Sequence, residues 1–370
     1  MAEALSIKEP AREASSSGHN HWPHATRGEY LLGDFTFNNG ERLAELRLHY
    51  QTLGTLKTSE DGKATNAVLI MHGTGGSSDQ FLNAQFAGEL FNPGQLLDAH
   101  KYFIILRDGI GHGRSSKPST SGLRARFPRY RYGDMVRADH RLLTEHLGVG
   151  HLRLAMGTSM GGMQSWQWGE AHPGFMDALM PLASLPVQIS GRNRLWRKMA
   201  MDAIRADPAW NGGDYPPSEQ PRAGLTTALD ILTLMSSSPL QYQAEAPTRD
   251  AADSFLERKI QNGLSLTDAN DLLFALDASF DYDPRPGLHK ITAPLIAVNT
   301  ADDQINPPEL GILERETRSG LKEGLGKVVV LPITEDTKGH GSHTVAKLWK
   351  HLLEELLLMT EKKADVKPAG

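Results

Sequence analysis

Short apolar runs alternate along the chain with longer stretches in which apolar residues recur every third or fourth position. Such runs are typical of strands buried on both faces of a sheet, and the spaced stretches are typical of amphipathic helices. The alternation predicts an α/β fold in which helices cover both faces of a mostly parallel central sheet. We expect the buried strands at residues 67–72, 102–106, 151–156, 177–182, 294–300 and 327–332, and helices at residues 79–90, 135–147 and 345–358.

Two parts of the chain depart from this alternation. Residues 29–37 and 45–53 alternate between apolar and polar positions, which predicts an antiparallel pair of strands. From about residue 186 to 289, helical segments follow one another between clusters of Pro, Gly and Ser, and such an insertion between strands predicts a lid. We therefore expect a disordered segment at 1–27, a core in two parts at 28–185 and 291–359, a helical lid at 186–290 and a flexible tail at 360–370.

A sharp turn joins the expected strand at 151–156 to the helix pattern that follows it. The turn reads Gly-Thr-Ser-Met-Gly, with Ser159 at its centre and Gly157 and Gly161 on either side. Glycines are needed there because a tight strand-to-helix bend brings neighbouring backbones too close for side chains. The bend presents the serine hydroxyl to a base, so Ser159 is the candidate nucleophile. The alternative is an ordinary loop whose serine caps the helix.

Two later loops supply the partners that a nucleophilic serine requires. A serine hydroxyl is a poor nucleophile at neutral pH, so an imidazole must accept its proton and a carboxylate must orient that imidazole. Asp303 follows the expected strand at 294–300, and His340 follows the strand at 327–332, in the order acid and then histidine. The neighbours Asp302 and His343 are the reserve candidates for the same two roles.

A glycine-rich turn after the first buried strand offers donors for an oxyanion. The turn reads Gly73-Thr74-Gly75-Gly76, and we assign the oxyanion hole to the backbone N–H groups of Thr74 and Met160. It lacks the Lys-Ser/Thr ending of a P-loop and the spacing of a dinucleotide fingerprint, so we expect no nucleotide cofactor. We expect His72 to steady this turn rather than to act as a base.

Composition narrows the class of protein further. The chain has 370 residues and a formal net charge of −5 from 39 basic and 44 acidic residues, so it carries no electrostatic footprint for nucleic acid. It contains no cysteine, which excludes disulfides, thiol nucleophiles and cysteine-ligated metals. The sequence shows no metal-binding spacing and no apolar segment of transmembrane length.

These observations predict a protein that binds a small-molecule ester and uses no cofactor and no metal. We expect no nucleic-acid partner and no membrane contact, and a cytoplasmic location. A periplasmic or secreted location stays open if a native signal peptide has been removed, because such a segment leaves no trace. A homodimer formed through the lid also stays open.

Several longer stretches resemble the homoserine O-acetyltransferase branch of the α/β-hydrolase superfamily, over about Gly33 to Leu358. The resemblance implies the α/β-hydrolase fold with an inserted helical lid. It also supports Asp303, which is followed by a variable residue, an aliphatic residue and soon a proline, and His340, which follows a glycine. The matching stretches are LRLHYQTLG at 46–54, SMGGMQ at 159–164, DPAW at 207–210, DAN at 268–270 and DDQINPP at 302–308.

Three loops around the expected site depart from this family. Residues 107–118, RDGIGHGRSSKP, are similar instead to the D-x-x-G-x-G-x-S-x-x-P run of ordinary α/β hydrolases. Residues 73–76 replace the family's Leu-Thr-Gly, and the acidic and aromatic residues that usually follow the family's histidine are missing after His340.

We therefore expect a serine esterase that passes an acyl group to water through an acyl-enzyme. The first alternative is an O-acyltransferase that moves an acyl group from acetyl-CoA or another acyl-CoA, as co-substrate, to an alcohol such as homoserine. The second alternative is a catalytically silent binding protein on the same fold.

Overall fold

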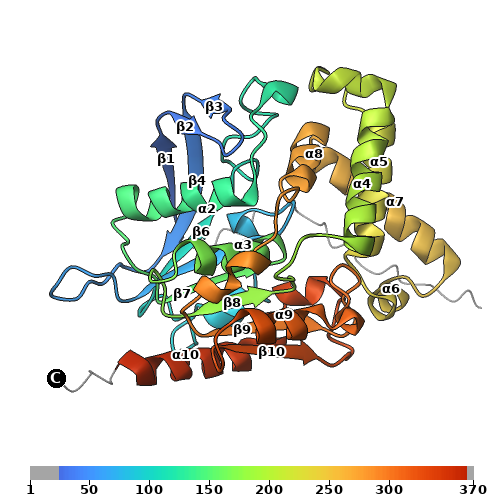
Figure 1. Cartoon of the computed structure of the whole chain (residues 1–370). Helices are drawn as coiled ribbons and strands as arrows, with labels where there is room; N and C mark the ends of the chain where they lie inside the picture. The colour runs from blue at the N-terminus through green and yellow to red at the C-terminus, as the bar shows by residue number, and fades with distance from the viewer. Residues whose placement is uncertain (1–24, 365–370) are drawn as a thin grey trace, which may run out of the picture.

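A computed structural model describes residues 25–364 of the chain. Its centre is an eight-stranded sheet, in which β1 and β4 run antiparallel to their neighbours and the other pairs are parallel (Figure 1). The mostly parallel sheet predicted from the apolar runs is therefore confirmed. In spatial order the strands are β1 (Thr26–Leu32), β4 (Leu46–Leu53), β6 (Phe103–Arg107), β5 (Ala67–Met71), β7 (Leu154–Thr158), β8 (Leu179–Leu182), β9 (Leu295–Thr300) and β10 (Gly326–Leu331).

Helices cover both faces of this sheet. In β5, Val68 and Ile70 face a core shared with α1 and α10. Leu69 and Met71 face the opposite core, which is shared with α2, α3 and α9. This alternation follows from the two-residue period of a strand, and it buries the whole of β5. The covering helices are α1 (Ala87–Leu90), α2 (Tyr132–Arg141), α3 (Met160–Ala171), α9 (Ile312–Gly320) and α10 (Lys350–Ala364).

Some predicted boundaries were wrong. The helix expected at 79–90 is a 3-10 turn, η1 (Ser78–Phe81), followed by the single turn of α1. The side chain of Asn83 accepts hydrogen bonds from the N–H groups of Gln85 and Phe86 and so interrupts the helical ladder. The helix expected at 135–147 begins at Tyr132 and ends in a π-helical turn at Leu142–His146. The helix expected at 345–358 starts as 3-10 turns and becomes α-helical at Lys350.

The two ends of the chain also differ from the expected pattern. The strand predicted at 29–37 ends at Leu32, and β2 (Phe35–Thr36) pairs instead with β3 (Arg42–Leu43) in a small separate ribbon. Of the segment predicted to be disordered, residues 1–24 lie outside the described residues, and Thr26 already begins β1. At the other end, α10 continues to Ala364, so the predicted flexible tail at 360–370 begins too early.

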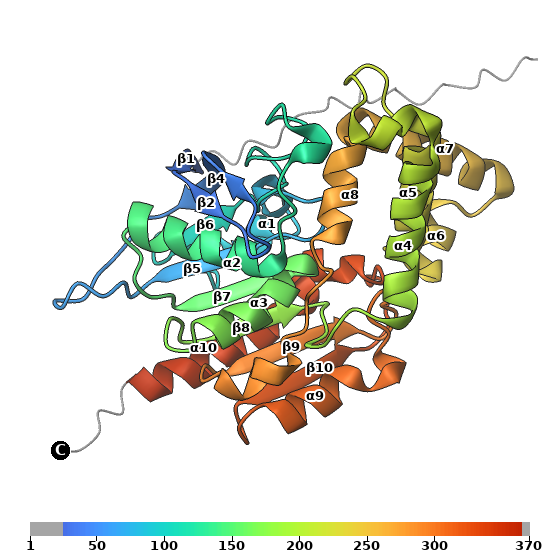
Figure 2. The same cartoon turned by 45° about the horizontal axis from the view of Figure 1, so that its top comes forward.

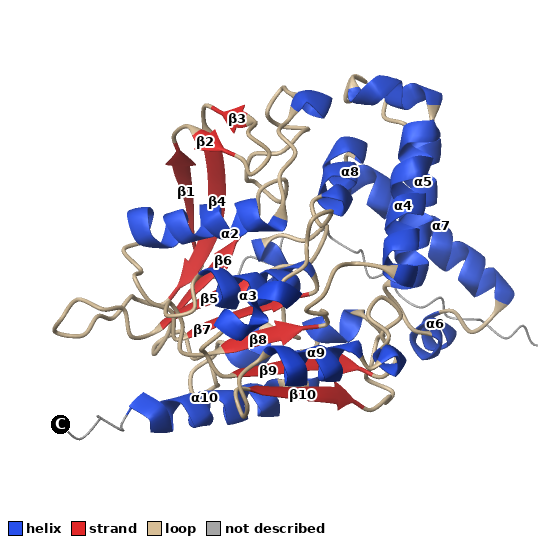
Figure 3. Ribbon diagram, in the orientation of Figure 1, coloured by secondary structure: helices blue, strands red, loops and turns tan. Residues whose placement is uncertain are grey.

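All the segments between β8 and β9 that carry regular structure are helical. Helices α4 to α8 are shown as a separate blue group in Figure 3, beyond the carboxyl ends of the parallel strands (Figure 2), whereas the 3-10 turn η5 (Arg285–Lys290) packs against α3 and α9. Trp196 and Met201 from this group share a core with Met160 and Met163 of α3, so the helices rest directly on the turn that carries Ser159. The longer helices of this insert are α4 (Gly191–Ala206), α5 (Arg222–Met235), α6 (Pro239–Glu245), α7 (Arg249–Leu266) and α8 (Ala269–Asp277).

Polar side chains define where the insert helices begin. Thr248 caps α7, and Asp268 caps α8 by accepting hydrogen bonds from the N–H groups of Asn270 and Asp271. Trp210 donates its indole N–H to Asn270 Oδ1 at 3.0 Å. The family-like stretches DPAW and DAN therefore hold the insert together, which explains their positions without a catalytic role.

Candidate active site

Ser159 lies at the junction of β7 and α3 in a backbone conformation that non-glycine residues rarely adopt. Its φ is 54° and its ψ is −111°. A Cβ at Gly157 would lie 2.2 Å from the carbonyl oxygen of Gly161, and a Cβ at Gly161 would lie 2.0 Å from that of Met71. Both glycines are therefore required by close backbone approach, as the sequence pattern predicts. The strained turn aims the Ser159 hydroxyl away from the sheet.

The side chains of Ser159, His340 and Asp303 form one continuous hydrogen-bonded chain. Ser159 Oγ lies 2.7 Å from His340 Nε2, and His340 Nδ1 lies 2.9 Å from Asp303 Oδ2. A carboxylate can only accept, so His340 donates its Nδ1–H to Asp303 and its Nε2 is free to accept the proton of Ser159. The structure thus brings together three residues that are up to 181 positions apart in the sequence.

Asp303 is buried and is held as a carboxylate. Its other oxygen accepts hydrogen bonds from the backbone N–H groups of Ile305 and Asn306 at 2.8 and 3.0 Å. Burial on its own would raise the pKa of Asp303, but the interaction with His340 and these two N–H groups lower it below its usual value. The ionised form, which the imidazole needs as its partner, is therefore the stable form near neutral pH.

The two reserve candidates lie beside this chain of hydrogen bonds but outside it. Asp302 Oδ2 accepts a hydrogen bond from the N–H of Gly339 at 3.0 Å, which anchors the loop that carries His340. The ring of His343 packs edge-on against that of His340, with 5.1 Å between the ring centroids. Burial lowers the pKa of His343 to about 3, so this imidazole is neutral.

The loop that carries His340 also rests on the helical insert. The N–H of Gly341 donates to the carbonyl of Ser236 at 3.3 Å. Gly339 has a φ of 57°, and a Cβ there would lie 2.5 Å from the carbonyl oxygen of Ser237. The end of α5 therefore forms part of the support of His340, and no other residue type fits at Gly339.

The oxyanion loop, residues 73–78, passes directly beside Ser159. A Cβ at Gly73 would lie 3.4 Å from Ser159 Cβ, so the next residue, Thr74, is placed close to the serine. Met160 is the first residue of α3, where the N–H groups have no partner within the helix. These positions suit the two predicted oxyanion donors.

His72 holds the start of this loop. Its Nδ1 lies 2.8 Å from the carbonyl oxygen of Gly73, and its Nε2 accepts a hydrogen bond from the N–H of Gly109 at 3.0 Å. Burial, and then the charge of Arg107, lower its pKa well below the usual value, so the ring is neutral. Both ring nitrogens are engaged with backbone, in agreement with the supporting role expected for His72.

A cavity of about 610 Å³ lies between the oxyanion loop and the insert. The wall that comes from the core is polar, and the wall that comes from the insert combines apolar side chains of α5, α7 and α8 with the carboxylates of Asp268 and Asp271. The ammonium group of Lys117, in the polar wall, lies 3.0 Å from the carboxylate of Asp271. The cavity is lined by Thr74, Gly75, Gly76, Ser77, Gln80, Gly111, His112, Gly113, Lys117, Leu229, Leu232, Leu266, Thr267, Asp268, Asp271, Leu272 and Ala275.

Sequence reasoning missed a buried arginine beneath the serine turn. Arg107 donates to Asp139 at 2.9 Å and to the side chain of Gln164, which belongs to the SMGGMQ run. All three residues are buried. In the sequence, Arg107 stands out as a charged residue at the carboxyl end of an apolar strand. Its partners, Asp139 and Gln164, could not be predicted without the fold. Among the residues that the structure describes, no cluster of His, Asp or Glu could hold a metal ion.

Comparison with known proteins shows the family to which the chain belongs. The pattern of the α/β-hydrolase fold family matches residues 66–325, which is more than half of the chain, and the protein belongs to that family. Within the family it belongs to the homoserine O-acetyltransferase-like branch, as the sequence resemblance indicated. None of the helices that the structure describes has the length and apolar character needed to cross a membrane.

Two relatives illustrate the likeness. A homoserine O-acetyltransferase from Haemophilus influenzae is 31% identical over 300 residues, which cover 73% of this chain and 81% of the relative. A homoserine O-acetyltransferase from Methanohalophilus mahii is 31% identical over 312 residues, which cover 76% of this chain. The matched region spans 62% of the length of that second relative.

Solved structures of both an esterase and an acetyltransferase share the fold. The acetyl esterase MekB superposes with a TM-score of 0.77 at 25% identity, covering 94% of this chain and all of the other. A homoserine O-acetyltransferase from Bacillus anthracis superposes with a TM-score of 0.76 at 21% identity, covering 90% of this chain and 97% of the other. The fold is therefore common to two reactions that differ in the acceptor of the acyl group.

Proposed function

We propose that the protein is a carboxylic ester hydrolase that works through an acyl-enzyme on Ser159. The observation that carries the proposal is the hydrogen-bonded chain from Ser159 through His340 to Asp303, with distances of 2.7 and 2.9 Å. These distances lie within the reach that proton transfer requires, and each group has the partner that its role demands.

In the acylation step, Ser159 Oγ attacks the ester carbonyl while His340 Nε2 accepts its proton. Asp303 keeps the imidazole oriented and stabilises the imidazolium that forms. The negative charge that develops on the carbonyl oxygen is stabilised by the N–H groups of Thr74 and Met160, where one such donor contributes about 3–4 kcal/mol. His340 then returns the proton to the departing alcohol, and the acyl group remains on Ser159.

In the deacylation step, a water molecule takes the place of the alcohol. His340 accepts a proton from this water as it attacks the acyl carbonyl, and the same oxyanion donors stabilise the second tetrahedral intermediate. Return of the proton to Ser159 releases the acid. We expect that water to approach from the cavity next to the oxyanion loop, which Thr74 lines.

The charges of the cavity support water rather than homoserine as the acceptor. Homoserine carries a carboxylate and an ammonium group, and acyl-CoA carries several phosphates, so either ligand needs a free cation in the site. Lys117 is the permanently cationic side chain among the described residues that line the cavity, and Asp271 already neutralises it at 3.0 Å. The charged side chains of the opposite wall, Asp268 and Asp271, are anionic and do not attract phosphates or a carboxylate, whereas its leucines suit an uncharged ester of a small alcohol. A solved structure at 25% identity, MekB, is named an acetyl esterase.

The role of Ser159 is tested by replacement with alanine. We expect Ser159→Ala to lose turnover of a neutral acetyl ester such as phenyl acetate by a factor of about 10⁴ or more while its melting temperature stays close to that of the parent. A fluorophosphonate probe should label the parent protein at Ser159. Labelling at another residue, or retained turnover in the variant, would reject the triad and favour the binding-protein alternative.

The acceptor is tested by adding homoserine to the ester assay. A hydrolase should release free acid at a steady rate that homoserine does not change. If release is instead a single burst that becomes continuous only when homoserine is added, and O-acetylhomoserine accumulates, the protein is an acyltransferase. This second candidate function is supported by two relatives that are named homoserine O-acetyltransferase. The same assay with acetyl-CoA as the acyl donor measures the transferase activity directly.

A further inference from the structure

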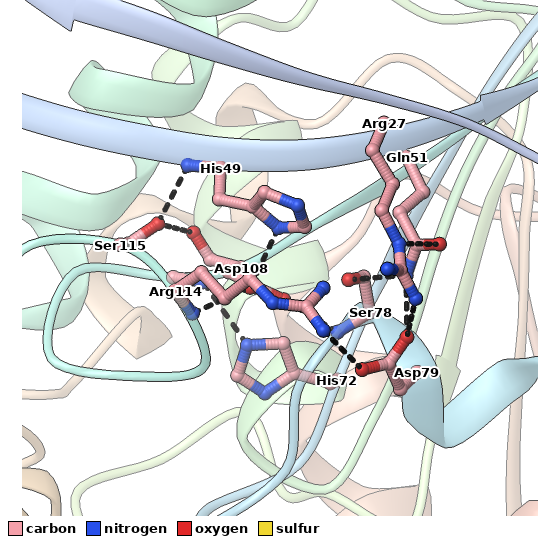
Figure 4. A network of polar contacts seen from close by, with 10 residues as sticks. Arg27, His49, Gln51, His72, Ser78, Asp79, Asp108, Arg114 and Ser115 are labelled. Atoms are coloured by element: carbon pink, nitrogen blue, oxygen red, sulfur yellow. Dashed lines mark hydrogen bonds and ion pairs between the residues drawn. The ribbon is translucent and has the colours of Figure 1, made fainter. Parts of the chain in front are cut away.

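The run at 107–118, which is similar to that of ordinary α/β hydrolases, contains a buried carboxylate that takes no part in the proposed mechanism. Asp108 follows β6 directly and is 1% exposed. It accepts hydrogen bonds from the N–H of Ser78 at 2.6 Å, the N–H of Arg114 at 2.8 Å and the Nδ1–H of His49 at 2.8 Å (Figure 4). One side chain thus joins three separate segments of the molecule.

The pair of Asp108 and His49 is held in place by Ser115. The backbone N–H of His49 donates to Ser115 Oγ at 2.9 Å, and Ser115 Oγ donates to the carbonyl of Asp108 at 2.7 Å. Burial alone would raise the pKa of Asp108, but the hydrogen bonds from His49, Arg114 and Ser78 outweigh burial and keep the carboxyl ionised. The carboxylate therefore stays ionised and can accept all three hydrogen bonds.

The oxyanion loop is anchored to this network at both ends. At its start, Gly73 is tied through His72 to the N–H of Gly109, the residue after Asp108. At its end, the N–H of Ser78 binds Asp108, and Ser78 Oγ accepts a hydrogen bond from Gln51 at 2.9 Å.

The middle of the loop is held by a turn hydrogen bond from the N–H of Gly76 to the carbonyl of Gly73 at 3.0 Å, and it is otherwise rich in glycine. Gly75, with a φ of 76°, and Gly76 follow Thr74, and glycine loses more conformational freedom on ordering than any other residue. A loop of this kind needs external anchors to hold the Thr74 N–H in one position. Residues after β6 provide such anchors at both ends of the loop, and Gln51 of β4 adds a further hydrogen bond at Ser78.

We propose that Asp108 and His49 are positioning residues that fix the oxyanion loop, and through it the Thr74 N–H, for the transition state. The inference rests on the proposed function, because it assumes that Thr74 N–H stabilises an oxyanion. Both side chains are buried, and neither lines the cavity. Because an oxyanion donor acts on charge that develops only in the transition state, misplacing it lowers kcat and leaves KM nearly unchanged.

The main test is Asp108→Asn, which keeps one acceptor oxygen where the carboxylate has two, so its NH2 group must face the N–H of Ser78 or the N–H groups of Arg114 and His49. Removal of a whole oxyanion donor costs about 10²–10³ in kcat, so loosening the loop should lower kcat for phenyl acetate tenfold to a hundredfold. His49→Leu should lower kcat in the same way. His49→Asn should restore most of it, because the side-chain N–H of asparagine can replace the Nδ1–H of histidine.

A second measurement separates positioning from a general loss of structure. Phenylboronic acid forms a tetrahedral anionic adduct with an active serine, whereas benzyl alcohol binds without covalent change. We expect the affinity for the boronic acid to fall in Asp108→Asn by about the same factor as kcat, and the affinity for benzyl alcohol to stay the same. Asp177→Asn is the control for an Asp–His contact remote from the loop: Asp177 lies 2.7 Å from His151 at the amino ends of β7 and β8, and its side chain is more exposed than that of Asp108.

The outcomes distinguish this inference from the proposed function. If the parent protein hydrolyses the ester and Asp108→Asn keeps the parent kcat, the positioning role is wrong and the proposed function stands. If kcat falls while boronic acid affinity is unchanged, or falls equally in Asp177→Asn, Asp108 stabilises the fold and does not position the loop. If the parent protein neither turns over the ester nor reacts with the fluorophosphonate, the proposed function itself fails.

Discussion

At the scale of single residues, the local backbone decides which of two neighbouring acids faces the imidazole. Asp303 is turned toward His340 because its other oxygen binds the N–H groups of Ile305 and Asn306 in a tight turn. Asp302, one position earlier, points to Gly339 instead. The order of nucleophile, acid and histidine could be predicted from the strands that precede them. The orientation of adjacent side chains within a loop could be predicted only through the family resemblance.

This difference between neighbours predicts unequal losses of activity. His340→Ala and Asp303→Asn should lose about 10⁴ or more in kcat, because members of a triad act as a unit. Asp302→Asn keeps an oxygen that can accept the N–H of Gly339, so its kcat should stay within a few-fold of the parent value. The measurement is steady-state hydrolysis of phenyl acetate by the three variants. A dead Asp302→Asn with an active Asp303→Asn would reverse the assignment.

At the scale of elements, the buried strands could be predicted well and the helices less well. Continuous apolar runs mark strands such as β5 and β9 because both faces of each are covered. The helix expected at 79–90 fails because one side chain, Asn83, captures the backbone N–H groups that a helix would use. The network of Asp108 could not be predicted, since His49 and Asp108 are 59 residues apart and meet only when β4 and β6 pair.

The serine turn provides a test of element packing. A Cβ at Gly161 would lie 2.0 Å from the carbonyl oxygen of Met71, so Gly161→Ala must push α3 away from β5. We expect this variant to lose kcat by at least tenfold and to melt at a lower temperature, because Ser159 and the oxyanion loop both move. Gly174→Ala is the control, since a Cβ at Gly174 meets nothing within 4 Å. The measurements are thermal melting and ester turnover of the two variants, and equal values for both would contradict the prediction.

At the scale of the whole molecule, several histidines are buried in the neutral form. Burial lowers the pKa of His112 to about 4 and that of His343 to about 3, and it is also the largest cause of the low pKa of His72. In the unfolded chain each of them titrates near its usual value of 6.5. Between the two pKa values the unfolded state binds more protons than the folded state, so stability contributed by these groups is lost as pH falls.

His112 allows this contribution to be measured. Its Nδ1 lies 2.9 Å from the carbonyl oxygen of Ile110, and an asparagine side chain can donate to the same oxygen without titrating. Relative to the parent, His112→Asn should gain about 1.4 kcal/mol in the free energy of unfolding per pH unit as pH is lowered from 6.5 toward 4. Urea unfolding of both proteins at several pH values gives the difference. A difference that does not change with pH would show that His112 has the same pKa in the folded and unfolded states.

The contact between the loop of His340 and the end of α5 limits how the protein can be redesigned. Exchanging the insert for that of another hydrolase is an obvious route to new substrates, because residues of α5, α7 and α8 form one wall of the cavity. Such a hybrid would also remove the carbonyl groups of Ser236 and Ser237, on which Gly341 and Gly339 rest. Substrate choice and the general base are therefore not separate modules in this chain. A graft that keeps residues 236–238 should retain activity that a complete exchange would lose.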